Sequence, residues 1–149
     1  MRPTYRPEAF ANFADPAVRA EFEAALRKVE SQLGRDYPLW IDGREIVTEA
    51  KITRVNPANF QQVVGRTSKG TAEHVEMAIK ACDRVFPTWS RKTLAERARY
   101  LYKAAAILRR RRHEFSAWMV KEVGKNWAEA DADVCEAIDF LEFYAPEAE

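Results

Sequence analysis

Apolar residues recur at helical spacing near the end of the chain. Side chains three and four positions apart share one face of a helix, so this pattern predicts one long helix. Gly124 and Lys125 come just before it and are typical of the point where a preceding helix ends. The stripe consists of Trp127, Ala130, Val134, Ala137, Ile138, Leu141, Tyr144 and Ala145.

A first helix is predicted near the other end of the chain. Asp15 can cap it and Pro16 fits its first turn, because a proline there loses no helical hydrogen bond. The apolar pattern continues to Leu33, and Gly34 is a natural stop.

The region from Thr71 to Gly124 is predicted to be helical throughout. One helix is expected to end at Pro87, since proline cannot continue the hydrogen-bond ladder. Thr93–Glu96 matches a capping box that opens the next helix, which ends in the basic run 109–112, and a further helix then reaches Gly124. The first of these helices has an apolar side that we expect to be buried, made of Val75, Met77, Ala78, Ala81, Cys82 and Val85.

Extended segments are predicted between the first and second helices. Leu39–Ile46 reads as two short strands around Asp42-Gly43, a dipeptide that tolerates a tight hairpin turn. Lys51–Val55 and Gln62–Thr67 read as two more strands, separated by the breaker Asn56-Pro57. These strands are too few to close a sheet that hides its own edges, so we expect them to join a larger body.

Glu136 lies nearly opposite the apolar stripe of the last helix, with Phe140 and Phe143 one and two turns further on. It is either an exposed acid beside rings that pack on a neighbouring element, or a carboxylate buried against those rings. Burial would favour its neutral form and suit it to proton handling or to gating a polar substrate. The pattern alone leaves both interpretations open.

Charge and hydropathy exclude several classes of protein. The 149 residues include 24 basic and 23 acidic ones, a net charge of +1, so no overall field favours nucleic acid or an anionic membrane. The basic run 109–112 could be a nucleic-acid patch, but a solvated helix end that complements the helix dipole is the simpler reading. No window reaches the roughly 18 apolar residues of a membrane helix. We expect a soluble, cytoplasmic protein.

The residues that usually bind metals or cofactors are sparse. His74 and His113 have no second ligand at zinc-like spacing, and we predict no metal site. Cys82 and Cys135 are expected to be free thiols in a reducing compartment. None of the five glycines has the spacing of a dinucleotide or phosphate loop, so no cofactor-binding residue is assigned.

Five blocks match one family, in family order. They are YPLWIDG at Tyr37–Gly43, VNPAN at Val55–Asn59, VVG at Val63–Gly65, KAAAILRRRRHEFSAW at Lys103–Trp118, and EVGKNWAEADADVCEAIDF at Glu122–Phe140. On these blocks the chain resembles the aldehyde dehydrogenase superfamily. Within it, the last block resembles the L-glutamate gamma-semialdehyde dehydrogenases, also called 1-pyrroline-5-carboxylate dehydrogenases.

The resemblance implies an α/β parent enzyme of which this chain is a mostly helical, incomplete part with a few short strands. By that likeness residues 1–36 are an amino-terminal helical arm, and residues 37–70 are strands of the oligomerisation and cofactor-domain region. Residues 71–149 are helices that flank the nucleotide-binding domain. Such enzymes are expected to be homo-oligomers.

The resemblance also implies an activity. Full-length relatives use NAD to oxidise L-glutamate gamma-semialdehyde to L-glutamate in proline catabolism, through a cysteine thiolate and a glutamate base. Neither Cys82 nor Cys135 has the glycine-rich flanks of that thiol, and no catalytic residue is assigned in this chain. Only Glu136 carries over, to a position near the catalytic cysteine and the substrate entrance.

These observations predict an amino-terminal piece of a dehydrogenase, or the product of a truncated gene. After Ala145 the chain departs from the family, and Pro146 is expected to end the helix. We expect the isolated chain to be inactive and to bind no NAD. The alternatives are a non-catalytic helical interaction module and the product of a decayed gene.

Overall fold

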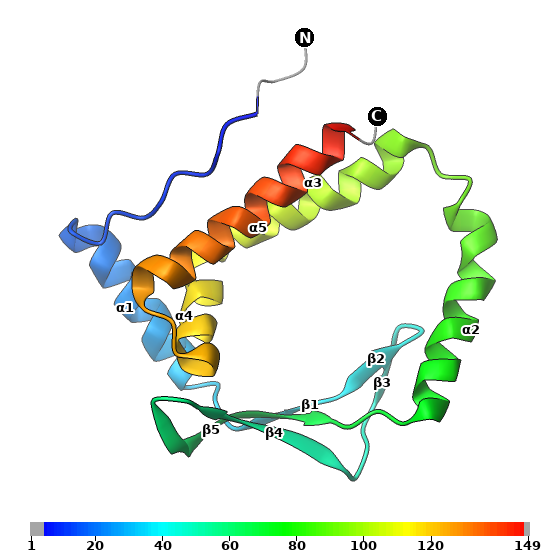
Figure 1. Ribbon diagram of the computed structural model, residues 1–149, viewed down its shortest axis with the longest axis horizontal. Helices are drawn as coiled ribbons and strands as arrows, with labels where there is room; N and C mark the ends of the chain where they lie inside the picture. Colours follow the sequence, from blue (N-terminus) through cyan, green and yellow to red (C-terminus); the bar gives the residue numbers. More distant parts are fainter. Residues whose placement is uncertain (1–4, 148–149) are drawn as a thin grey trace. The chain divides into compact units, whose positions relative to one another are not determined.

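The computed structural model describes residues 5–147, which form two compact units (Figure 1). The first unit combines the chain up to Ser31 with the chain from Thr93 onward, and the second is Gln32–Lys92. As predicted, helices dominate and the strands are few and short. The division into regions 1–36, 37–70 and 71–149 concerns roles in a complete enzyme and stays a prediction.

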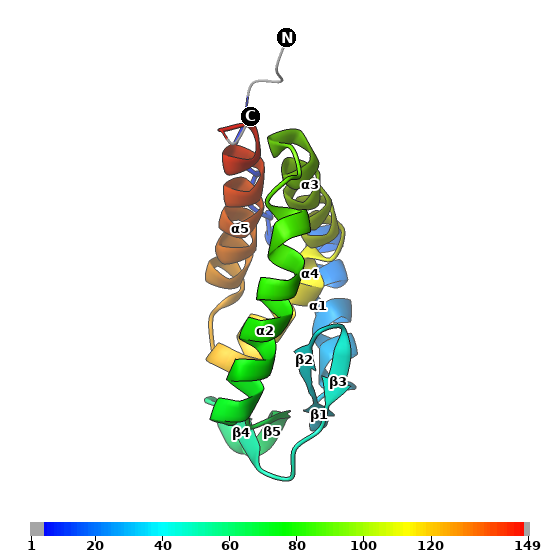
Figure 2. The same ribbon diagram turned by 90° about the vertical axis from the view of Figure 1, so that its right-hand side faces the viewer.

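Among the described residues of the first unit, helices alone make up the regular structure. The longest, α5, lies alongside α3 and also packs on α4, while α1 packs on α4 (Figures 1 and 2). The bounds are Pro16–Glu30 for α1, Leu94–Arg110 for α3, Arg112–Val123 for α4 and Trp127–Glu147 for α5.

The helix ends follow the local signals that the sequence contains. The Asp15 side chain accepts a hydrogen bond from the Ala17 N–H at 2.8 Å, and Thr93 and Glu96 form a reciprocal capping box. Gly124 ends α4 with φ 76°, which glycine adopts without strain. These predictions are confirmed.

Three predicted helix ends are wrong by a few residues. α1 ends at Glu30, before Leu33, because the chain turns there to enter a strand. α2 (Ala72–Trp89) continues past Pro87, and α5 continues past Pro146 to Glu147. Pro87 and Pro146 each lie in the last turn of their helix, where the loss of one backbone hydrogen bond leaves the preceding residues helical.

The core of the first unit forms where α3, α4 and α5 meet. Ala105, Val134 and Ile138 are fully buried there, with Leu108, Phe115, Met119 and Leu141 packed around them. A second cluster surrounds the fully buried Phe22 of α1 and is made of the rings of Phe13, His113 and Trp127. The stripe on α5 is therefore core as predicted, except that Tyr144 is 56% exposed.

Two small sheets and one helix form the second unit. In the three-stranded sheet, β5 lies between β1, which is parallel to it, and β4, which is antiparallel. β2 and β3 form a hairpin whose turn has positive φ at Asp42 and Gly43, as predicted. The bounds are Arg35–Tyr37 for β1, Leu39–Ile41 for β2, Arg44–Ile46 for β3, Lys51–Asn56 for β4 and Asn59–Ser68 for β5.

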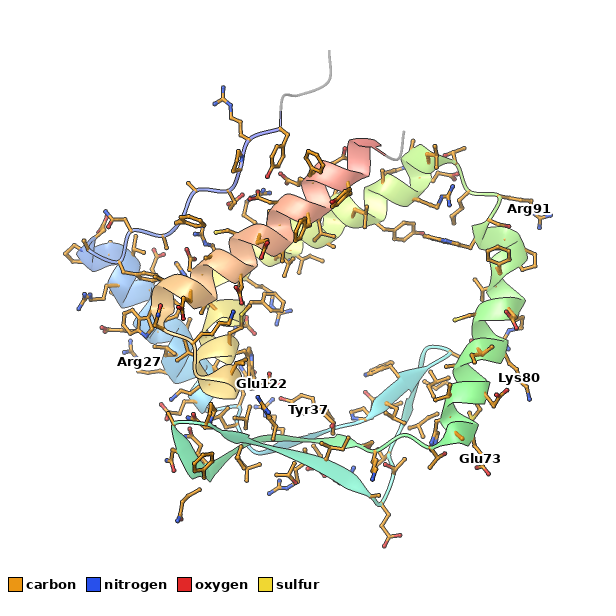
Figure 3. All side chains as sticks on the ribbon, viewed as in Figure 1. Arg27, Tyr37, Glu73, Lys80, Arg91 and Glu122 are labelled. Carbon is orange, nitrogen blue, oxygen red and sulfur yellow. The ribbon has the colours of Figure 1, made fainter. Side chains whose placement is uncertain are left out.

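The predicted buried side of α2 is wrong for this chain. None of the residues of α2 is buried, and Val75 and Met77 of the predicted side are 57% and 49% exposed. The exposed side chains of Glu73 and Lys80 project outward from α2 (Figure 3). The helix is amphipathic, and within the second unit most of its apolar side stays uncovered.

Candidate functional site

Glu136, the one predicted site residue, lies on the exposed side of α5. Phe140, one turn on, is 52% exposed and stacks on Tyr144 at 6.0 Å between ring centroids. Phe143 meets the rings of Tyr5 and Tyr144 edge to face at 5.5 and 5.2 Å. The acid therefore stands beside an aromatic cluster, defined as Tyr5, Phe140, Phe143 and Tyr144, that faces solvent.

This geometry bears on the two readings of Glu136. The Glu136 side chain is exposed in this chain, so it is not buried against the rings. The rings beside it form an apolar surface of the kind that contacts another molecule or another part of a larger protein. Its role near a substrate entrance stays a prediction.

The buried polar centre of the first unit is an ion pair between α4 and α5. Arg112 donates from Nε and Nη2 to the two carboxylate oxygens of Asp131, both at 2.6 Å. The Asp131 side chain is 1% exposed, and it also accepts from the Ala11 N–H at 2.8 Å. Burial alone would raise the pKa of Asp131, but the hydrogen bonds from Arg112 and Ala11 outweigh it and the pKa is lowered.

The basic run 109–112 lies at the end of α3 with residues 109–111 exposed, as the sequence predicts, but most of its charges are paired. Arg109 pairs with Glu8 at 2.8 Å and with Glu142 at 2.9 Å, and Arg111 pairs with Glu114 at 2.8 Å. With Arg112 on Asp131, three of the four guanidinium groups are held by carboxylates of their own unit. The run therefore does not form an unpaired basic patch for a nucleic-acid backbone.

The two cysteines are free thiols in very different surroundings. Cys135 is buried on α5, and its Sγ lies 3.9 Å from the carbonyl oxygen of Ala9 and 3.9 Å from Asp131. Burial raises the pKa of Cys135 to about 11, so the thiol is protonated at neutral pH and unsuited to nucleophilic attack. Cys82 is exposed on α2.

An apolar groove of about 450 Å³ lies in the second unit, between the β2–β3 hairpin and α2. Trp40 and Ile41 form one wall, and the Arg84 guanidinium reaches Asp42 across the hairpin turn at 2.5 Å. The α2 wall consists of Ala78, Ala81, Cys82, Val85, Phe86 and Trp89. An open apolar groove with so few polar groups fits a protein surface better than a polar small molecule.

The residues present do not form a cradle for a dinucleotide. The connection from β5 to α2 runs from strand to helix, as a phosphate loop does, but it contains a single glycine, Gly70. The Thr71 N–H at the start of α2 already donates to Nδ1 of His74 at 3.0 Å. Among residues 5–147 there is also no group of three or more side chains that could hold a metal ion.

Comparison with known proteins decides the family. Residues 40–149 match the model of the aldehyde dehydrogenase family. The chain belongs to the aldehyde dehydrogenase family.

Within this family the chain is similar to 1-pyrroline-5-carboxylate dehydrogenases. It is 56% identical to the enzyme of that name from Geobacillus thermodenitrificans over 94% of this chain and 27% of the relative. It is 53% identical to 1-pyrroline-5-carboxylate dehydrogenase 2 from Halalkalibacterium halodurans over 97% of this chain and 28% of the relative.

Solved structures of the family agree with the fold. The structure of 1-pyrroline-5-carboxylate dehydrogenase from Thermus with bound NAD has a TM-score of 0.94 and 42% identity, covering 97% of this chain and 28% of that one. Proline utilization A from Bdellovibrio bacteriovorus has a TM-score of 0.95 and 34% identity, covering 97% of this chain and 15% of that one.

This aldehyde dehydrogenase chain spans little more than a quarter of the length of the curated relatives that it matches. In the part of the chain that the structure describes, no helix is long and apolar enough to cross a membrane.

The ion pair between Arg112 and Asp131 was not predicted from the sequence. The sequence carries one signal of this pair, a basic run and a set of acidic residues on successive helices. That signal does not specify which basic residue binds which acidic residue.

Proposed function

We propose that this chain supplies the amino-terminal region of an NAD-dependent dehydrogenase that oxidises L-glutamate gamma-semialdehyde to L-glutamate. The observation that carries the proposal is the 56% identity to a 1-pyrroline-5-carboxylate dehydrogenase over 94% of this chain. The complete protein works as a homo-oligomer, and its reacting groups lie outside these 149 residues.

The chain itself provides a scaffold and one wall of the site. Its buried thiol, Cys135, is protonated at neutral pH, and its glycines do not cradle a pyrophosphate. The free chain therefore neither binds NAD tightly nor oxidises aldehydes. Turnover of NAD by the pure 149-residue chain would overturn this part of the proposal.

A chimera tests the proposed activity. This chain replaces the matching 140 residues of the Geobacillus thermodenitrificans relative, and NADH formation is measured with L-glutamate gamma-semialdehyde. We expect activity within about tenfold of the unaltered relative, since variation over more than half-identical segments mostly concerns surface positions. Propionaldehyde, which has no amino-acid head group, is the control substrate and is expected to react poorly. A soluble chimera that binds NAD but forms no NADH from either aldehyde would refute the proposal.

In the same chimera Glu136 is proposed to lie at the substrate entrance. Replacing Glu136 with alanine is expected to change KM for the aldehyde by about tenfold, the effect of losing one polar contact to a substrate. Glu129, another exposed glutamate of α5, is the matched control, and Glu129→Ala is expected to leave KM unchanged. Equal changes in KM from the two substitutions would show that Glu136 has no special role.

A second candidate function is a non-catalytic interaction module. The exposed apolar side of α2, the groove beside it and the open edges of β1 and β4 favour it. The partner is the remaining part of a dehydrogenase of this family. The free chain should then form a complex with the carboxyl-terminal part of the Geobacillus relative in sedimentation velocity. A clean monomer in that mixture would exclude this function.

A further inference from the structure

The segment before α1 follows the surface of α5 without forming a helix or strand (Figure 1). The Glu8 N–H donates to Oδ1 of Asp139 at 2.8 Å, and the Ala11 N–H donates to Oδ2 of Asp131 at 2.8 Å. Between these bonds the Ala9 carbonyl oxygen lies 3.9 Å from Sγ of Cys135. The segment is therefore bound through its backbone to one helix.

The contacts on α5 form a single row. Asp131, Cys135, Asp139 and Phe143 are each four residues apart, so they lie one above another along the helix. They meet, in that order, Ala11, Ala9, Glu8 and Tyr5, which means that the segment runs antiparallel to the helix. Hydrogen bonds from backbone N–H groups to carboxylates are stronger than those between neutral groups.

Charge on the neighbouring helices adds to this attachment. The Glu8 carboxylate binds Arg109 at 2.8 Å and lies 3.8 Å from Arg112. Apolar burial contributes little before Phe13, because Phe10 is 72% exposed and Tyr5 and Phe143, whose rings are in contact, are 38% and 44% exposed. Phe13 is different, since its ring packs on Phe22 and Trp127 at 5.2 and 5.6 Å.

We infer that residues 5–11 form a strap that detaches from α5 as one unit, hinged next to the ring of Phe13, and that the docked strap shields the Cys135 thiol. A segment held by a few polar contacts, with no backbone ladder, opens at lower free energy than the helices beneath it. Opening removes the Ala9 carbonyl from Cys135 and exposes the sulfur to solvent. This inference concerns the chain itself and does not depend on its role in a dehydrogenase.

Thiol alkylation of the 149-residue chain tests the strap. The chain is treated with N-ethylmaleimide, and modification of Cys135 and Cys82 is followed separately by peptide mass spectrometry. Asp139→Ala removes the acceptor for the Glu8 N–H, so it is expected to speed modification of Cys135 by about tenfold. Modification of Cys82, which is already exposed, should not change. Asp133→Ala, on the same helix but paired with Lys125 away from the strap, is the matched control and should leave both rates unchanged.

Urea separates release of the strap from unfolding of the helices. Opening of a short segment exposes little surface, so in the parent chain the modification rate of Cys135 should depend only weakly on urea. A rate that follows global helix loss in both the parent and Asp139→Ala would overturn the inference. If the free chain does not fold, the same peptide is followed in the chimera, where the same two results decide.

Discussion

Replacing Arg112 with alanine is expected to destabilise the first unit by about 3–5 kcal/mol. The substitution leaves the Asp131 carboxylate, 1% exposed, without the two hydrogen bonds that hold it ionised in the interior. The remaining bond from the Ala11 N–H cannot offset the desolvation of a charge. The loss is measured as the shift in free energy of unfolding in urea, followed by helical circular dichroism.

Two controls identify burial as the cause. Lys125, just before α5, and Asp133 of α5 also form an ion pair, but both side chains are about one-third exposed, so Lys125→Ala should cost only about 0–1 kcal/mol. Replacing Arg112 by Met and Asp131 by Leu together removes both charges and should recover most of the stability that Arg112→Ala loses. Equal losses in the free energy of unfolding for Arg112→Ala and Lys125→Ala would show that the buried pair contributes no more to stability than the exposed pair.

Local signals predicted most helix starts and stops, because each depends on atoms only a few residues apart. Asp15, Thr93 and Gly124 stand where the caps they predict are found. The hairpin at Asp42-Gly43 is also a local feature, since two residues with positive φ decide its turn. The apolar stripe of α5 was correct for the same reason, except at Tyr144, near the end of the helix.

The missed features all depend on which distant segments meet. β1 is three exposed residues, Arg35–Tyr37, and it is a strand because β5 pairs with it in parallel. Gly65 belongs to this pairing, since a Cβ on it would lie 2.9 Å from the Tyr37 ring. The partner of Arg112 is nineteen residues away on another helix. No periodicity in the sequence specifies such pairs.

The wrong prediction that one side of α2 is buried has a different cause. The apolar spacing of α2 is that of a helix with a buried side, yet Val75 of that side and the apolar Ile79, one turn further along the helix, are about half exposed. A contiguous apolar surface on a helix usually marks contact with another protein surface. We propose that the remaining part of the dehydrogenase covers this side of α2. A charged residue placed on this side should then have little effect in the free chain and a large effect in the complete protein.

Replacing Ile79 with lysine is accordingly expected to be nearly silent in the free chain, where the position is exposed and changes of this kind stay within about 0.5 kcal/mol. In the chimera the same lysine would be buried without a partner, and the yield of assembled, active enzyme should fall by about 100-fold or more. Urea unfolding of the free chain and NADH formation by the chimera provide the two measurements. Glu76→Lys, an exposed charge reversal on the same helix, is the matched control and should lower neither. An Ile79→Lys chimera as active as the Glu76→Lys chimera would mean that the apolar side of α2 is exposed to solvent in the complete protein as well. The apolar residues of α2 would then not form a contact surface.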